Sequence, residues 1–327
     1  MRFLSFLTIA VLIASVMAPA AHAAEPILIR FSHVTSENSP KGQGAVMFKR
    51  LAEERLAGKV KVEIYPNSQK FDDNQAPLGL LFGDIEMAAP SLSKFRAYSK
   101  KMQVFDLPLL FSDIDALHRF QQSRAGKALL DSMITRGIKG LTYWDNGPRV
   151  ISAKRAIKQP ADAKRLVFRI EASAVFQEQY ARVGAVGIEM PFKRLPDAMK
   201  EGLISAQENA WSNIRSMQVH KFHNHFTELG HSYLGYMVIT SAAFWNGLPA
   251  DVRTQLEAIL KEVTDKVNSL AAEQALSARQ EVLQSGAKLV ELSEADRRAW
   301  RDALTPVWKR FENEIGSDLI SAARASN

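Results

Sequence analysis

The chain has 327 residues, of which 46% are hydrophobic and 24% charged, and it contains 17 glycines, 13 prolines and no cysteine. This composition excludes a disordered chain, a collagen-like repeat and a disulfide-stabilised mini-domain, and the lack of cysteine excludes thiolate catalysis and iron–sulfur ligation. An excess of 42 Lys and Arg over 35 Asp and Glu favours an anionic partner without identifying its class. The length predicts about two domains of roughly 150 residues each.

The N-terminus has the three-part pattern of a secretory signal peptide. Arg2 supplies the positive charge, an uncharged apolar stretch runs from Leu4 to Met17, and Ala-His-Ala at 21–23 places small residues where signal peptidase cuts. The stretch is shorter than the ~18 residues that a membrane span needs, so we expect a cleaved leader at 1–23. The mature chain is then exported, with the bacterial periplasm as its expected location. An exported protein rarely meets nucleic acid, so we expect no nucleic-acid partner.

Alternating apolar residues predict two early strands with a helix between them. The first strand lies near 27–32, the helix over 45–56 and the second strand over 60–64. A strand, a helix and a strand within about 40 residues form a βαβ unit, which predicts a parallel pair with a right-handed crossover.

The same pattern continues along the chain. Short apolar strands are predicted near 85–88, 141–144, 166–170 and 238–240, with helical stretches over 113–136 and 172–183. The alternation of strands and helices predicts the α/β fold class.

A long helix is predicted from Ala250 to Ser285, a segment without glycine or proline that Pro249 precedes and Gly286 ends. At 1.5 Å per residue it would reach roughly 50 Å, longer than one domain of this size, so it could bridge two lobes. A helix broken near Asn268 or Ser269 is the alternative.

One further helix is predicted after Ser293, with Ser293 as N-cap and Asp296 in its first turn. Its expected apolar face consists of Trp300, Leu304, Trp308 and Phe311. No flexible linker separates two halves of the chain, so we expect the chain to cross between the lobes more than once.

Catalytic and metal-binding motifs are scarce. Ser91 and Lys94 match the Ser-x-x-Lys pattern of acyl-enzyme proteins, but neither Ser-Asp-Asn nor Lys-Thr-Gly accompanies it, so an exported serine hydrolase is the less favoured alternative. Histidines gather at positions 220, 223, 225 and 231. They could bind a transition metal, but the polar surroundings favour a solvated segment.

Two arginines occupy unusual places. Arg169 lies in the segment 166–170, a strand that should be nearly all apolar if helices cover both sheet faces. Because ligands of open α/β sheets bind at the carboxyl ends of strands, its planar fork could hold a carboxylate there. A salt bridge to Glu171 or Glu178 is the structural alternative. Arg149 follows another predicted strand and could reach the same crevice or stay in a surface loop.

Several segments resemble the substrate-binding subunits of TRAP transporters. The resemblance is carried by Phe31–Lys41, Val104–Phe111, Phe168–Ile170 and Gln207–Asn213, and the segments Pro90–Phe95, Tyr236–Thr240 and Phe244–Pro249 are similar to the C4-dicarboxylate-binding (DctP) branch. These segments cover the mature chain in the family's order, which is more specific than any single motif. The sequence departs from the family pattern around Gln-Glu-Asn and at Arg194-Leu195.

This resemblance implies a two-lobed periplasmic-binding-protein fold with crossing strands and a long helix spanning both lobes. We expect lobe I at 24–146 plus 235–274 and lobe II at 147–234 plus 275–327. The receptor is expected to close on an organic acid and to deliver it to TRAP membrane permease subunits, with no enzymatic activity, cofactor or metal.

The resemblance also implies a ligand and its site. Arg169 pairs with a ligand carboxylate, Asn209 supports the same carboxylate, and Arg149 takes the family's basic position after an Asn-Gly turn. More loosely matched residues for a distal carboxylate or the cleft wall are His33, Lys41, Ser91, Lys94, Trp211 and Tyr236. The expected ligand is a C4-dicarboxylate such as malate, succinate or fumarate, and a keto, sugar or aromatic acid is the alternative.

Overall fold

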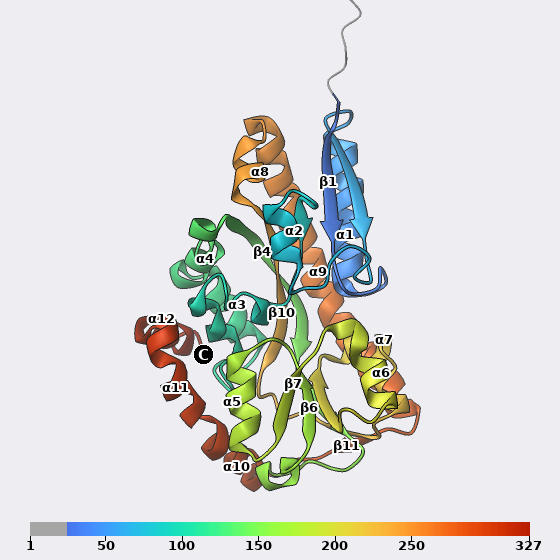
Figure 1. Cartoon of the computed structure of the whole chain (residues 1–327), viewed down its shortest axis with the longest axis vertical. Helices are drawn as coiled ribbons and strands as arrows, with labels where there is room; N and C mark the ends of the chain where they lie inside the picture. Colours follow the sequence, from blue (N-terminus) through green and yellow to red (C-terminus); the bar gives the residue numbers. More distant parts are fainter. Residues whose placement is uncertain (1–24) are drawn as a thin grey trace, which may run out of the picture.

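Two β-sheets organise the computed structural model, which describes residues 25–327 (Figure 1). The signal peptide expected at 1–23 lies outside the described residues. The five-stranded sheet has the order β2-β1-β3-β10-β4 and defines the first lobe; the six-stranded sheet has the order β11-β9-β5-β8-β6-β7 and defines the second lobe. The described part of the chain includes no helix long and apolar enough to span a membrane.

The first lobe confirms the predicted βαβ unit, because β1 pairs in parallel with β2. Its elements are β1 (Ile27–Ser32), β2 (Val60–Tyr65), β3 (Met87–Ala88), β4 (Ile138–Pro148), β10 (Tyr233–Ser241), α1 (Pro40–Arg55), α2 (Ala76–Leu81), α3 (Ile114–Gln122), α4 (Arg124–Leu130) and α8 (Ala242–Gly247). Helix α1 begins earlier than predicted because the Ser39 hydroxyl caps it by accepting from the amide of Gly42. The predicted helical stretch 113–136 is divided at Ser123, which caps α4.

The second lobe contains several strands that the sequence pattern did not predict. Its elements are β5 (Val150–Ala153), β6 (Val167–Ile170), β7 (Val186–Glu189), β8 (Ala206–Asn209), β9 (His225–Thr227), β11 (Lys288–Val290), α5 (Ala174–Arg182), α6 (Leu195–Lys200) and α7 (Trp211–Ser216). Strand β8 has the sequence AQEN and is fully buried. A short strand of polar residues gives no hydrophobic alternation, so only its pairing with β5 and β6 reveals it.

The chain crosses between the lobes through β4 and β10, as expected. These two strands pair in antiparallel along nearly their whole length. A single residue, Arg149, separates β4 of the first sheet from β5 of the second. A functional side chain at this position therefore lies where the lobes join.

Helix α9 (Ala250–Gln284) has 35 residues and is unbroken, which confirms the long helix and excludes a break near Asn268. Its first half buries residues such as Leu256 and Val263 in the core shared with α1 and β1. Its second half buries Ala278 and Val282 against the second lobe. Figure 1 shows α9 passing along both lobes.

The C-terminal segment differs from the single predicted helix. Pro306 separates α10 (Glu294–Leu304) from α11 (Pro306–Ile315), and α12 (Ser317–Arg324) follows. The predicted cap is confirmed, since Ser293 and Asp296 form a capping box.

The C-terminal helices return the chain to the first lobe (Figure 1). Phe311 of α11 and Ile320 of α12 join the apolar cluster that contains Phe105 and Phe120. The expected lobe boundaries stay a prediction, and this packing is a reason to place α11 and α12 with the first lobe.

Candidate functional site

Charged side chains are buried where the two lobes face each other. We define the cleft cluster as Lys41, Asp73, Lys94, Arg149, Arg169 and Glu171, which influence one another electrostatically. Lys41, Arg149 and Arg169 are each at most 1% exposed, and Lys94 is partly exposed. Asp73 and Glu171 lie among these four cations, and Glu208 lies 3.7 Å from Arg149. Three carboxylates therefore face four cations, and a buried cation without a carboxylate partner is costly.

Arg169 is held by a backbone carbonyl and has no ion pair. It lies near the end of β6, and its Nε and Nη2 atoms donate to the carbonyl oxygen of Met190 at 3.0 and 2.8 Å. No carboxylate among residues 25–327 lies within 4.0 Å, so the alternative salt bridges to Glu171 and Glu178 do not form. Burial lowers the pKa of Arg169. The Nη1/Nη2 edge remains available for a carboxylate with two parallel hydrogen bonds.

Arg149 is buried and paired, which excludes its alternative placement in a surface loop. Its guanidinium bonds to Glu171, lies 3.7 Å from Glu208 and packs over the ring of Phe176. Burial alone would lower the pKa of Arg149, but the two carboxylates hold it above its ordinary value. This side chain is a fixed part of the cleft wall.

Glu171 connects the lobes and was not singled out as a site residue from the sequence. It follows β6, and its Oε2 atom accepts hydrogen bonds from Arg149 and, at 2.8 Å, from the hydroxyl of Ser91 in the first lobe. Burial would raise the pKa of Glu171, but Arg149, Lys94 and Arg169 hold it well below its ordinary value. A glutamate after a strand is unremarkable in sequence, and only its contacts with Arg149 and Ser91 make it a candidate site residue.

Lys41 forms the first-lobe wall of the cluster. It lies in the first turn of α1, donates to the carbonyl oxygen of Ala89 at 2.9 Å and sits 3.7 Å above the ring of Tyr236. Burial lowers the pKa of Lys41, and Asp73 and Glu171 offset part of that effect.

His33 is buried after β1 and remains neutral at pH 7. Burial, together with the charge of Lys41, lowers the pKa of His33 to about 3. Its Nε2 atom is buried and has no hydrogen-bond partner among the described residues. A neutral imidazole is therefore available as a hydrogen-bonding group beside Lys41.

Asn209 of β8 and Tyr236 of β10 are joined by Asn213, whose side-chain NH2 group donates to both. The Asn209 side-chain oxygen accepts from the amide group of Asn213 at 2.8 Å, which leaves its own NH2 group to donate elsewhere. The Tyr236 hydroxyl accepts a hydrogen bond from the side-chain NH2 group of Asn146 at 2.8 Å. The backbone of Tyr236 forms an isolated antiparallel β-bridge with Ser91.

Trp211 contacts residues outside the cleft cluster. Its indole N–H donates to Glu228, which also accepts from Arg279 of α9. Its ring packs against Phe226, with centroids 5.4 Å apart. The structure thus places this expected site residue against the long helix.

A hollow of about 650 Å³ leads to the cluster between the lobes. Asn74, Lys94 and Tyr98 line it from the first lobe, and Ala172 and Glu189 line it from the second. Lys94 lines this hollow, and Glu171 and Arg169 of the cluster both act on its pKa. In the described structure no hydrogen bond joins the Ser91 hydroxyl to the side-chain nitrogen of Lys94, as this hydroxyl donates to Glu171.

A second serine–carboxylate contact joins the lobes beside the first. Asp106 accepts hydrogen bonds from Ser93 of the first lobe and Ser173 of the second, both at 2.7 Å. Burial raises the pKa of Asp106 to about 6, although the two hydroxyls oppose this effect. Together with Ser91 and Glu171, this contact holds the lobes against each other.

The histidine-rich stretch is partly buried, so its predicted solvated character was wrong for two members. His231 is fully buried and lies 2.5 Å from the carboxylate of Glu208. His223 is 1% exposed and bonds to Ser152 at 3.0 Å. Residues 25–327 contain no group of three or more His, Cys, Asp or Glu side chains that could hold a metal ion.

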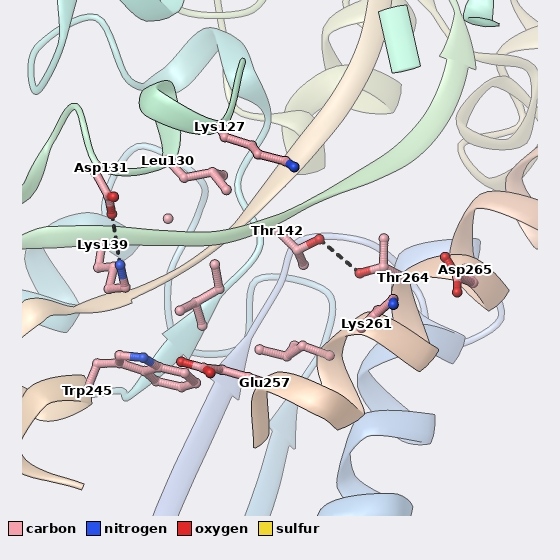
Figure 2. Close-up of a pocket in the computed structure, with 13 residues that line it drawn as sticks. Lys127, Leu130, Asp131, Lys139, Thr142, Trp245, Glu257, Lys261, Thr264 and Asp265 are labelled. Carbon is pink, nitrogen blue, oxygen red and sulfur yellow. Dashed lines mark hydrogen bonds and ion pairs between the residues drawn. The ribbon is translucent and has the colours of Figure 1, made fainter. Parts of the chain in front are cut away.

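A separate surface groove of about 460 Å³ lies between β4 and α9 (Figure 2). Its polar lining residues are Lys127, Asp131, Lys139, Thr142, Glu257, Lys261, Thr264 and Asp265. Lys139 pairs with Asp131 at 2.8 Å, and the hydroxyls of Thr142 and Thr264 are 3.0 Å apart. None of the expected site residues lines this groove.

Comparisons with known proteins agree with this architecture. Residues 31–314 match the family model DctP, described as bacterial extracellular solute-binding protein, family 7. The C4-dicarboxylate-binding periplasmic protein DctP of Shewanella loihica is 46% identical over 93% of this chain and 91% of its own length.

Two solved structures are similar over most of the chain. A TRAP periplasmic solute-binding protein of Shewanella oneidensis with bound succinate has a TM-score of 0.91 and 47% identity, covering 92% of this chain and 99% of that one. A TRAP periplasmic solute-binding protein of Pseudomonas aeruginosa with bound L-malate has a TM-score of 0.85 and 46% identity, covering 87% and 100%.

Proposed function

The chain belongs to the DctP family of bacterial extracellular solute-binding proteins, and from this premise we propose that its own ligand is a C4-dicarboxylate held by the cleft cluster. It is a solute-binding receptor of the TRAP type. Succinate and L-malate, the ligands of the two similar structures, are the first candidates.

The observation that carries this proposal is a buried set of cations without matching carboxylates. Lys41, Lys94 and Arg169 form no ion pair within 4.0 Å inside the described range 25–327. A ligand dianion would supply negative charge to these three cations. We assign one carboxylate to the open edge of Arg169, supported by the NH2 group of Asn209, and the other to the side of Lys41.

Closure of the lobes is the proposed mechanism of capture. Ser91 with Glu171, and Asp106 with Ser173, join residues of opposite lobes. The ligand adds contacts to both lobes only when they are closed, so its binding shifts the population toward the closed state. The receptor then presents the acid to a TRAP membrane permease at the outer face of the cytoplasmic membrane, in the periplasm.

Binding without conversion is part of the proposal. The Ser91 hydroxyl donates to Glu171 instead of Lys94, an arrangement that supports a binding role over serine catalysis. The acid should therefore be recovered unchanged after incubation with the protein.

A ligand panel tests the proposed function. The unfolding temperature of the exported chain is measured with succinate, L-malate, fumarate, a keto acid, a sugar acid and an aromatic acid, followed by titration calorimetry. At 100 times its dissociation constant, a true ligand adds about 2.7 kcal/mol to the free energy of unfolding. A shift by a sugar or aromatic acid, with none by the dicarboxylates, would contradict the assignment.

A further inference from the structure

Glu171 has one carboxylate oxygen that accepts no hydrogen bond from the described residues. Its Oε2 atom takes both hydrogen bonds, from Arg149 and from Ser91. No donor within residues 25–327 bonds to Oε1, and the side chain keeps 8% exposure. Because Arg149 and Ser91 come from the two sides of the cleft, the unused oxygen has a fixed position in the closed protein.

The surroundings keep this oxygen negatively charged. Although burial opposes ionisation, Arg149, Lys94 and Arg169 hold the pKa of Glu171 well below its ordinary value. An ionised carboxylate accepts hydrogen bonds and donates none. A ligand group that faces Oε1 must therefore be a donor or uncharged.

Glu171 lies near two cations of the cleft cluster, because it follows Arg169 by two residues and its partner Ser91 precedes Lys94 by three. Among carboxylates it acts most strongly on the pKa of Arg169 and of Lys94, where it opposes the lowering caused by burial. Side chains two residues apart along a strand lie on the same face of the sheet, so we expect a dicarboxylate on the open edge of Arg169 to have part of its carbon chain beside Glu171, just after the end of β6. A hydroxyl there gains a charge-assisted hydrogen bond, and a further carboxylate meets a like charge at low dielectric.

We propose that Glu171 is the specificity-determining residue of the cleft, selecting dicarboxylates with a hydroxyl donor on the carbon chain and rejecting acids with a third carboxylate. This inference rests on the proposed dicarboxylate function and names the ligand class of that site. Ser91 and Arg149 act as positioning residues, because they fix the carboxylate that faces the ligand.

Titration calorimetry with succinate, L-malate and the tricarboxylate tricarballylate tests this selection. The exported chain should bind L-malate about tenfold more tightly than succinate, and tricarballylate at least 100-fold more weakly than succinate. In Glu171→Gln the malate-to-succinate preference should fall to within about twofold, since a neutral acceptor forms the weaker hydrogen bond. The penalty on tricarballylate should shrink at least tenfold in the same variant.

Glu178→Gln is the matched control, because this carboxylate lies on the outer side of α5 and pairs with Arg182. It should leave all three affinities unchanged. If Glu171→Gln does not fold, Glu171→Asp replaces it, because withdrawing the carboxylate by one methylene should remove the malate preference as well.

Three results would overturn the proposal: no malate preference in the unchanged chain, an unchanged affinity ratio in the variant, or an equal loss for all ligands, which would make Glu171 purely structural. Failure of the unchanged chain to bind any dicarboxylate would instead contradict the proposed function.

Discussion

The cleft cluster and the surface groove of Figure 2 contain the same kinds of side chain in different environments. In the groove, Lys139 keeps 26% exposure and pairs with Asp131 at 2.8 Å. In the cleft, Lys41 is fully buried and has a carbonyl and an aromatic ring as its contacts. Water screens the groove charges, whereas the cleft charges keep most of their strength and favour an anionic ligand.

Replacing Arg169, the cation whose Nη1/Nη2 edge is open, should have the largest effect on dicarboxylate affinity. We expect Arg169→Lys to weaken dicarboxylate binding on the order of 100-fold, because a point ammonium cannot form two parallel hydrogen bonds and cannot replace both contacts to Met190. Titration calorimetry measures the affinity. Arg182→Lys, an exposed position on α5, is the control and should bind normally. Unchanged binding in Arg169→Lys would refute the assigned role.

Replacing Lys41 should lower the affinity for the ligand and raise the stability of the ligand-free protein. Lys41→Met should weaken dicarboxylate binding about tenfold and raise the free energy of unfolding of the ligand-free protein by about 1 kcal/mol, since a buried charge without a carboxylate partner is removed. Calorimetry and urea denaturation measure the two quantities. Lys49→Met, on an exposed part of α1 beside Glu53, should change neither affinity nor the ligand-free stability by this amount. A less stable variant with normal affinity would make Lys41 a structural residue.

Substitutions in the surface groove should have the smallest effect on dicarboxylate affinity and on stability. Lys127→Ala and Lys261→Ala should change dicarboxylate affinity by less than about twofold and the free energy of unfolding by less than about 0.5 kcal/mol, because both side chains are exposed. The same titrations apply. A large loss of affinity in either variant would show that the groove and the cleft are coupled. It would contradict the conclusion that only the cleft charges act on the ligand.

Several elements were predictable because their signals are local. Alternation in β1 and β2 and the uninterrupted segment of α9 follow from residues close together in the chain. The missed strands, such as β8, are short, buried and polar, so their identity depends on partners from distant segments. The last predicted helix is divided at Pro306. This proline is a local signal for a helix boundary, but the continuous apolar spacing on both sides of it favoured a single helix.

The candidate site was predictable only in part. Arg169 stood out because an arginine in an apolar strand is unusual, and the family resemblance supplied its role. Glu171 did not stand out, because the contact that defines it joins it to Ser91 across 80 residues of sequence. His231 was expected in solvent for the same reason, since its partner Glu208 lies on a strand that the pattern did not predict.

The sequence by itself determined the α/β class, the long helix, the family and the presence of a buried arginine. The tertiary structure alone decided which carboxylate neutralises which cation: Glu171 pairs with Arg149, and Arg169 keeps an edge without a partner among residues 25–327. The physical reason is that periodicity depends on neighbouring residues, whereas the electrostatics of a buried charge depend on everything packed around it. Only the folded chain brings those groups together.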